Sequence, residues 1–305
     1  MTIAYVFPGQ GSQTVGMGAK LAAVSPAARR VFAEADEILG FPLSRLCWEG
    51  PEEALTATAN AQPALLVSSV AAWRAGVEDG LWPAEPPRFV AGHSLGEYSA
   101  LVVAGALTFA DALRLVRRRG ELMQACGEAC PSTMAAVLGL DEATVAAICA
   151  ETGAEIANVN APGQIGISGP RAAVERASAL ARDRGARRVI PLNVSAAFHS
   201  SVMRPAAEGL AAAIATTPIA DADPPLIANV DAAPLRAAAD LRRELVDQLT
   251  RPVRWQRTIE VLAENGVTQL YEIGTGTVLC GLAKRTAPHL IAENPVETVL
   301  GKGAS

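Results

Sequence analysis

Residues 88–100, RFVAGHSLGEYSA, decide the fold of this chain. They read as a short apolar strand, a tight turn of the form G-x-S-x-G, and a helix rich in Ala, Leu and Val. This order is typical of a nucleophile elbow, in which a serine lies at the apex and the flanking glycines let the backbones pass closely. Ser94 would then project from the turn, with the N–H groups at the start of the helix available to an oxyanion. Because Gly and Ser are common residues, other parts of the chain have to decide whether this serine is a nucleophile.

The composition indicates a globular protein with a sizeable core. The 305 residues are 50% hydrophobic and 19% charged, which suits one large domain with a small insert. The net charge of −5 argues against a nucleic-acid partner, and no apolar run is long enough for a membrane span. The first residues lack the positive region of a signal peptide. The five cysteines form no C-x-x-C pair, so we expect free thiols in a reducing cytoplasm.

Alternating strands and helices predict an α/β fold with a mainly parallel sheet. Besides the elbow, strands are expected at 3–7, 226–230 and 269–273, and helices at 26–39, 62–76, 111–124, 241–249 and 278–284. The first strand ends in a Pro-Gly loop that carries Gln10, at the sheet edge where open α/β folds bind ligands. The Gln10 amide could donate a hydrogen bond there, or it could lie solvated on a turn. Residues 288–305 carry no structural signal.

Arg119 lies in the wrong place for a surface cation. The apolar residues of the helix expected at 111–124 share one face, and Arg119 falls in the middle of it, between Val116 and Met123. A guanidinium cannot be deprotonated and is costly to bury alone. It could form a structural salt bridge, snorkel out to water, or clamp the carboxylate of a substrate. Helix geometry alone leaves these alternatives open.

Residues 131–191 form a separate pattern, which we expect to be a small subdomain inserted into a large domain of residues 1–130 and 192–305. Its strands are expected at 133–138, 155–160, 164–168 and 187–191, and its helices at 141–151 and 170–184. This βαββαβ order is that of the ferredoxin-like, split βαβ unit, and the segment 161–163 supplies its hairpin turn. Strand–helix alternation resumes after residue 191, so the large domain continues there.

The chain has only three histidines, which narrows the choice of a general base. His93 is adjacent to Ser94 in a tight turn, where neighbouring side chains point apart. His289 follows the last clear strand–helix unit. His199 lies where the small subdomain rejoins the large one, at a junction where a cleft is expected. His199 is therefore the best candidate base for Ser94, although a lone histidine is often structural.

Six segments of the chain together match one family. In chain order they are VFPGQGSQ (6–13), GHSLGEY (92–98), RGELM (119–123), NVNAPGQ (158–164), FHS (198–200) and PVRW (252–255). With them the chain resembles the malonyl-CoA:acyl carrier protein transacylases of bacterial fatty acid synthesis and the related acyltransferase domains of polyketide synthases. The resemblance covers nearly the whole chain. It implies an α/β-hydrolase-like core with a ferredoxin-like subdomain, in agreement with the pattern of strands and helices.

The resemblance also implies roles for individual residues. Ser94 matches the acylated nucleophile, His199 the general base, and Arg119 the arginine that holds the malonyl carboxylate. The backbone N–H of Leu95 matches one of the two oxyanion-hole positions, and Gln10 matches the other.

Three further positions follow from the same resemblance. Gln248 matches the residue whose main-chain carbonyl orients the histidine in place of a triad acid. Asn160 matches a position that lines the site from the small subdomain. Phe198 resembles the bulky residue of malonyl-selective members, which leaves little room for a 2-methyl group.

The reaction implied by the resemblance is a ping-pong transfer. Ser94 takes the malonyl group from malonyl-CoA, CoA leaves, and the phosphopantetheine thiol of acyl carrier protein takes the group over. We expect neither a metal nor a cofactor, and a monomer is the usual case for the family. One alternative is a discrete acyltransferase serving a polyketide synthase. Another is a serine thioesterase or esterase, in which a late histidine such as His289 would be the base.

Overall fold

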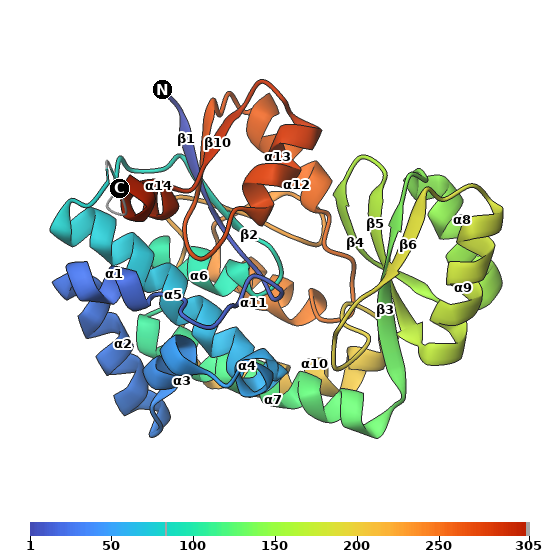
Figure 1. Ribbon diagram of the computed structural model, residues 1–305, viewed down its shortest axis with the longest axis horizontal. Coiled ribbons are helices and arrows are strands. Elements are labelled where there is room, and N and C mark those ends of the chain that lie inside the picture. Colours follow the sequence, from blue (N-terminus) through green and yellow to red (C-terminus); the bar gives the residue numbers. More distant parts are fainter. Residues whose placement is uncertain (83, 303–305) are drawn as a thin grey trace.

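Two sheets organise the molecule, as the computed structural model of residues 1–82 and 84–302 shows (Figure 1). The larger sheet has the order β10-β9-β1-β2-β7-β8, and every neighbouring pair in it is parallel except β7 with β8. Its strands are β1 (Ile3–Phe7), β2 (Phe89–Gly92), β7 (Leu226–Ile227), β8 (Pro234–Leu235), β9 (Gln269–Glu272) and β10 (Ile291–Glu293). The mainly parallel α/β sheet predicted from the sequence is confirmed.

Helices cover both faces of this sheet, which is why its central strands are apolar throughout. Ile3, Tyr5 and Phe7 of β1 face one buried cluster, whereas Ala4 and Val6 face the other. The first face carries α1 (Ala19–Val24), α2 (Pro26–Leu39), α3 (Leu43–Glu49), α4 (Glu52–Thr56), α5 (Thr58–Asp79), α6 (Gly96–Val103), α7 (Phe109–Ala129), α10 (Arg204–Thr216), α11 (Ala238–Asp247) and α14 (Pro295–Lys302). The second face carries α12 (Trp255–Glu264) and α13 (Val278–Thr286).

The smaller sheet is fully antiparallel and lies to one side of the molecule (Figure 1). Its order is β4-β5-β3-β6, with β3 (Ser132–Leu138), β4 (Glu155–Ala161), β5 (Gln164–Pro170) and β6 (Arg188–Pro191). Two helices, α8 (Glu142–Thr152) and α9 (Arg171–Asp183), pack on it around a third buried cluster. This is the βαββαβ arrangement that the sequence pattern predicts.

Several elements differ in length from the sequence predictions. Helices α5 and α7 extend beyond the ranges 62–76 and 111–124 at both ends. The strand expected at 226–230 stops at Ile227, because the N–H groups of Asn229 and Val230 donate to glutamate side chains instead of a neighbouring strand. The tail without signal contains β10 and α14, which the sequence analysis missed. Within the residues described here, no helix combines the length and apolar character that a membrane span requires.

Candidate active site

The elbow holds Ser94 in a strained backbone conformation between β2 and α6. Its φ of 52° lies in the left-handed region, which non-glycine residues enter rarely and mostly at functional sites. A Cβ on Gly92 would lie 1.9 Å from the carbonyl carbon of Gly96, and one on Gly96 would lie 2.2 Å from the carbonyl oxygen of Phe7. The sequence therefore needs glycine at both positions for the strand and the helix to meet this closely.

Asn229, two residues beyond the end of β7, fixes the elbow. The Ser94 N–H donates to Asn229 Oδ1 over 2.7 Å, and Asn229 Nδ2 donates to the Gly92 carbonyl over 2.7 Å. The side chain thus bridges both arms of the turn. Asn229 was not among the residues singled out from the sequence. The available signal was a polar asparagine within the apolar run 226–230.

His199 is the histidine that reaches Ser94. Its Nε2 lies 2.8 Å from Ser94 Oγ, and its Nδ1 lies 2.8 Å from the main-chain carbonyl oxygen of Gln248. That carbonyl accepts only from an N–H, so it fixes the tautomer in which Nε2 is free to take a proton. His199 also has a left-handed φ of 57°, so both partners of this contact lie on strained backbone.

The other two histidines are directed elsewhere. His93 Nε2 lies 2.8 Å from Asn160 Oδ1, and the ring packs against Trp255. His289 is exposed in the turn after α13. Asn160 therefore lies behind His93, while Asn158, two residues earlier on β4, lines the cavity next to Ser94.

Arg119 comes from α7 and is 1% exposed. Its guanidinium donates to Gln62 Oε1 and to Gln248 Oε1, each over 2.8 Å, and to Ser94 Oγ over 3.0 Å. Among the described residues no carboxylate lies within ion-pair distance, and Arg119 Nε has no hydrogen-bond partner. A structural salt bridge and a side chain that snorkels to water are therefore both wrong for this residue. A buried cation without an ion-pair partner therefore faces Ser94.

Burial and the nearby Arg119 charge together set the protonation of His199. Burial, followed by repulsion from Arg119, lowers the pKa of His199 to about 3. The imidazole is therefore neutral at pH 7 and able to accept a proton. Burial also lowers the pKa of His93. Neither histidine adds positive charge to a site that already holds Arg119.

The cavity at this site has a volume of about 140 Å³. Ser94, His199, Arg119, Gln10 and Phe198 all line it. Gln10 Nε2 donates to Thr58 Oγ1 over 3.2 Å, so its amide is anchored to α5. Leu95 is the N-cap of α6, and its N–H belongs to the helix start, where N–H groups lack acceptors within the helix. The residues singled out from the sequence thus surround one small cavity, except Asn160, Leu95 and Gln248, which adjoin those that line it.

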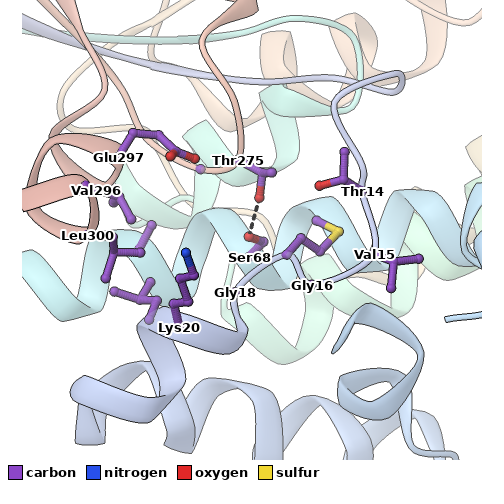
Figure 2. A pocket seen from close by; sticks show the side chains of 15 residues that line it. Thr14, Val15, Gly16, Gly18, Lys20, Ser68, Thr275, Val296, Glu297 and Leu300 are labelled. Carbon is purple, nitrogen blue, oxygen red and sulfur yellow. Dashed lines mark hydrogen bonds between the residues drawn. The ribbon is translucent and has the colours of Figure 1, made fainter. Parts of the chain in front are cut away.

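A second cavity, larger than the one at Ser94, lies elsewhere in the molecule. It measures about 380 Å³ between the loop after β1, α5 and α14 (Figure 2). Ser68 and Thr275, which line it, are joined by a hydrogen bond of 2.9 Å. Lys20 and Glu297 also line it (Figure 2). It contains no histidine and no cysteine. Within residues 1–82 and 84–302 no cluster of three His, Cys, Asp or Glu residues could hold a metal ion.

Comparisons with known proteins define the class. Residues 4–303 match the model of the acyl transferase domain. The chain is 48% identical to the malonyl CoA-acyl carrier protein transacylase of Bacillus subtilis, covering 97% of this chain and 95% of the relative. It is 46% identical to the enzyme of the same name from Salmonella typhimurium, covering 95% and 94%.

Solved structures agree with these relatives. An acyl carrier protein S-malonyltransferase from Vibrio cholerae superposes with a TM-score of 0.93 at 42% identity, over 98% of this chain and 100% of that one. A malonyl-transacylase in complex with the acyl carrier protein of a type II polyketide synthase gives 0.93 at 43% identity, over 99% and 100%.

The fold is thus that of an acyl transferase domain. Within that class, the chain belongs to the malonyl-CoA:acyl carrier protein transacylase family.

Proposed function

We infer that the protein transfers the malonyl group of malonyl-CoA to the phosphopantetheine thiol of acyl carrier protein, for fatty acid synthesis, through an ester on Ser94. The full-length relatives carry the activity in their names. The assignment of roles to residues depends on the surroundings of one atom, Ser94 Oγ. Ser94 Oγ lies within 3.0 Å of both a neutral base, His199, and an unpaired buried cation, Arg119. A short acyl group ending in a carboxylate can meet all three.

The first half-reaction forms the ester. His199 Nε2 takes the proton of Ser94 Oγ as the oxygen attacks the thioester carbonyl, and the carbonyl oxygen becomes an oxyanion. The Leu95 N–H and Gln10 are the proposed donors to it. When the intermediate collapses, the carbon–sulfur bond breaks and His199 returns the proton to the departing CoA sulfur.

The second half-reaction reverses these roles. The phosphopantetheine thiol gives its proton to His199 and attacks the ester carbonyl. The bond to Ser94 Oγ breaks, and His199 reprotonates the serine. The protein is unchanged, and the malonyl group has moved from one thiol to the other. The Gln248 carbonyl holds the imidazole in the same tautomer through both halves.

Arg119 accounts for selectivity in two ways. A malonyl carboxylate would pair with the guanidinium, whereas an acetyl group would leave this buried cation unpaired. The Arg119 charge also lowers the pKa of His199, so a paired carboxylate would offset that charge and make His199 a stronger base. The correct substrate would therefore strengthen the base that takes the proton of the attacking Ser94. Phe198, 6% exposed on the cavity wall, would add a steric limit on a 2-methyl group.

Several further features belong to the proposal. Residues 131–191 would form the small subdomain, which places β4 and Asn160 beside the elbow. Acyl carrier protein would be the protein partner, and CoA the small-molecule product. We propose a monomer in a reducing compartment such as the cytoplasm, where its free cysteines would stay reduced.

Two rival functions are tested by the same experiments. A serine esterase using His289 would lose activity in His289→Ala and keep it in His199→Ala. Our proposal expects the reverse.

A polyketide role has some support, because the chain is 49% identical to part of a polyketide biosynthesis protein of Burkholderia thailandensis, covering 24% of that protein. Malonyl transfer to carrier proteins of both kinds, measured side by side, separates the pathways. Faster transfer to the fatty-acid carrier protein is expected, and a preference for the polyketide carrier would contradict it.

A further inference from the structure

Two buried glutamates lie beneath the elbow and take no part in the reaction described above. Glu97 is 0% exposed in the first turn of α6, three residues after Ser94, and Glu244 is 6% exposed on α11. The same backbone N–H, that of Asn229, donates to Glu97 Oε1 over 2.7 Å and to Glu244 Oε1 over 3.0 Å. Among the described residues neither carboxyl forms an ion pair with Lys or Arg. Two carboxyls thus converge on one donor in the interior.

Glu97 is connected to the site through the side chain of Gln248. Gln248 Nε2 donates to Glu97 Oε2 and, over 3.0 Å, to the Ser94 carbonyl. This fixes the amide so that its Oε1 faces Arg119 Nη2 at 2.8 Å. The main-chain oxygen of the same residue accepts from His199. One residue therefore carries contacts to the glutamate pair, the cation and the base.

The charge of Glu97 determines which way this amide points. If Glu97 Oε2 carried a proton, Gln248 would have to turn its oxygen toward Glu97. Its NH₂ group would then face the Arg119 guanidinium, donor against donor. The observed contacts need an oxygen without a proton at Glu97 Oε2. They leave Glu97 Oε1 and the Glu244 carboxyl, on the side away from Gln248, to hold any proton of the pair.

We propose that Glu97 and Glu244 share one proton, and that the singly charged pair acts through Gln248 to position Arg119 and His199. The proposal rests on the proposed function for its kinetic consequences, but not for the shared proton itself. Two full charges on adjacent buried carboxyls would repel, whereas one proton turns that repulsion into a hydrogen bond. The remaining negative charge is the counterpart of Arg119 while no substrate is bound. Both glutamates are positioning residues, because neither touches the reacting atoms.

Burial supports this protonation. Burial, together with repulsion from Glu244, raises the pKa of Glu97 well above its usual range. Burial raises the pKa of Glu244 to about 7, and repulsion from Asp231 adds to this. The charged groups facing the pair are Arg119 from α7 and, around a small cavity at Glu244, Asp231, Asp240, Arg243, Asp247 and Arg251. That cavity gives the pair a route for proton exchange that does not pass through the active site.

Two glutamine substitutions distinguish this arrangement from simple packing. In Glu244→Gln, the amide NH₂ can donate to Glu97 and the amide oxygen can accept from Asn229, as a protonated Glu244 would. We expect kcat/KM for malonyl-CoA to fall by only about threefold at pH 7, since an isosteric donor replaces the acid. In Glu97→Gln, one amide cannot accept from both Asn229 and Gln248. Gln248 turns, Arg119 loses an acceptor, and we expect a loss of about 100-fold, as for a displaced preorganised donor.

The pH profile and the acyl preference supply readouts that packing alone would not move. The wild-type protein should lose kcat/KM at alkaline pH as the pair gives up its proton, and Glu244→Gln should lack this alkaline limb. Glu97→Gln should lose malonyl transfer more than acetyl transfer. Glu272→Gln is the matched control: Glu272 is equally buried but accepts from Leu279 and Cys280, away from the site. It should keep the wild-type pH profile and acyl preference whatever its thermal stability.

An infrared difference spectrum tests the shared proton without any activity. The carbonyl stretch of a buried protonated carboxylic acid should be present in the wild-type protein and Glu272→Gln, and absent in Glu244→Gln. A band that persists in Glu244→Gln would overturn the proposal. Equal losses in Glu97→Gln and Glu244→Gln, with the alkaline limb retained, would also overturn it. If the wild-type protein proved inactive toward malonyl-CoA, the proposed function would fail while the infrared result would still decide the shared proton.

Discussion

Replacing Arg119 by alanine removes the buried cation that we assign to the malonyl carboxylate. The guanidinium is 1% exposed and has only neutral partners, so a bound carboxylate would form a desolvated charge pair with it. Truncating one partner of such a pair typically costs about 2–5 kcal/mol. This corresponds to a loss of about 30-fold to several thousandfold in kcat/KM for malonyl-CoA.

Acetyl transfer should respond differently to the same change. An acetyl group has no carboxylate to pair with, and removing Arg119 relieves one of the causes that lower the pKa of His199. Acetyl-CoA should therefore be used as well as before or better, and the malonyl-to-acetyl ratio should collapse. Arg119→Lys should recover part of the malonyl rate, because it restores charge without the planar fork.

The assay is acyl-enzyme formation from each CoA ester, followed by rapid quench and mass spectrometry. It needs no carrier protein, so docking defects do not enter. Arg114→Ala is the matched control, because Arg114 lies on the same helix with its side chain 62% exposed. Equal losses with malonyl-CoA and acetyl-CoA in Arg119→Ala, beyond those of the control, would show that the arginine is structural and refute the reasoning.

Three further predictions follow from the same geometry. His199→Ala should abolish acyl-enzyme formation and His289→Ala should not; retained burst formation in His199→Ala would exclude it as the base. Because the folded pKa of His199, about 3, is below the ordinary value of 6.5, the folded state binds fewer protons between these values, so stability should fall as pH decreases from 6.5 to 3. This difference in pKa changes the free energy of unfolding by at most about 5 kcal/mol between pH 6.5 and 3. In His199→Gln, urea titrations run across that pH range should show a weaker dependence of stability on pH. An unchanged pH dependence would contradict this prediction. Gly96→Ala should destabilise the protein by more than about 3 kcal/mol, since its Cβ would lie 2.2 Å from the Phe7 carbonyl oxygen, whereas Gly281→Ala, in open space on α13, should stabilise it by up to about 1 kcal/mol. Similar unfolding midpoints for both glycine variants would contradict the account of the elbow.

The features predicted from the sequence were those with a local signature. The glycines around Ser94 and the βαββαβ order of residues 131–191 depend on spacing within short segments, and the structure confirms both. Arg119 was singled out because helical periodicity places it on an apolar face. That periodicity left open what the guanidinium contacts, and the structure shows it buried without a carboxylate partner.

Features that depend on distant segments were missed or left open. Asn229 bridges the elbow from more than 130 residues away, and no local pattern shows that contact. The glutamates that end the strand at Ile227 come from α6 and α11, so the early stop was not visible in the apolar run 226–230. The short β10 forms only by pairing along β9, and a three-residue edge strand carries too little periodicity to be recognised.

The central claim is that Ser94 carries the malonyl group between two thiols, and the most direct test is to trap it there. The protein is incubated with malonyl-CoA alone, quenched in acid, digested and examined by tandem mass spectrometry. The account predicts one malonyl group on Ser94, its absence in Ser94→Ala, and its disappearance when acyl carrier protein is added before the quench, with malonyl-carrier protein formed in equal amount. A malonyl group on another residue, or none on wild-type protein that still transfers malonyl to the carrier, would contradict it.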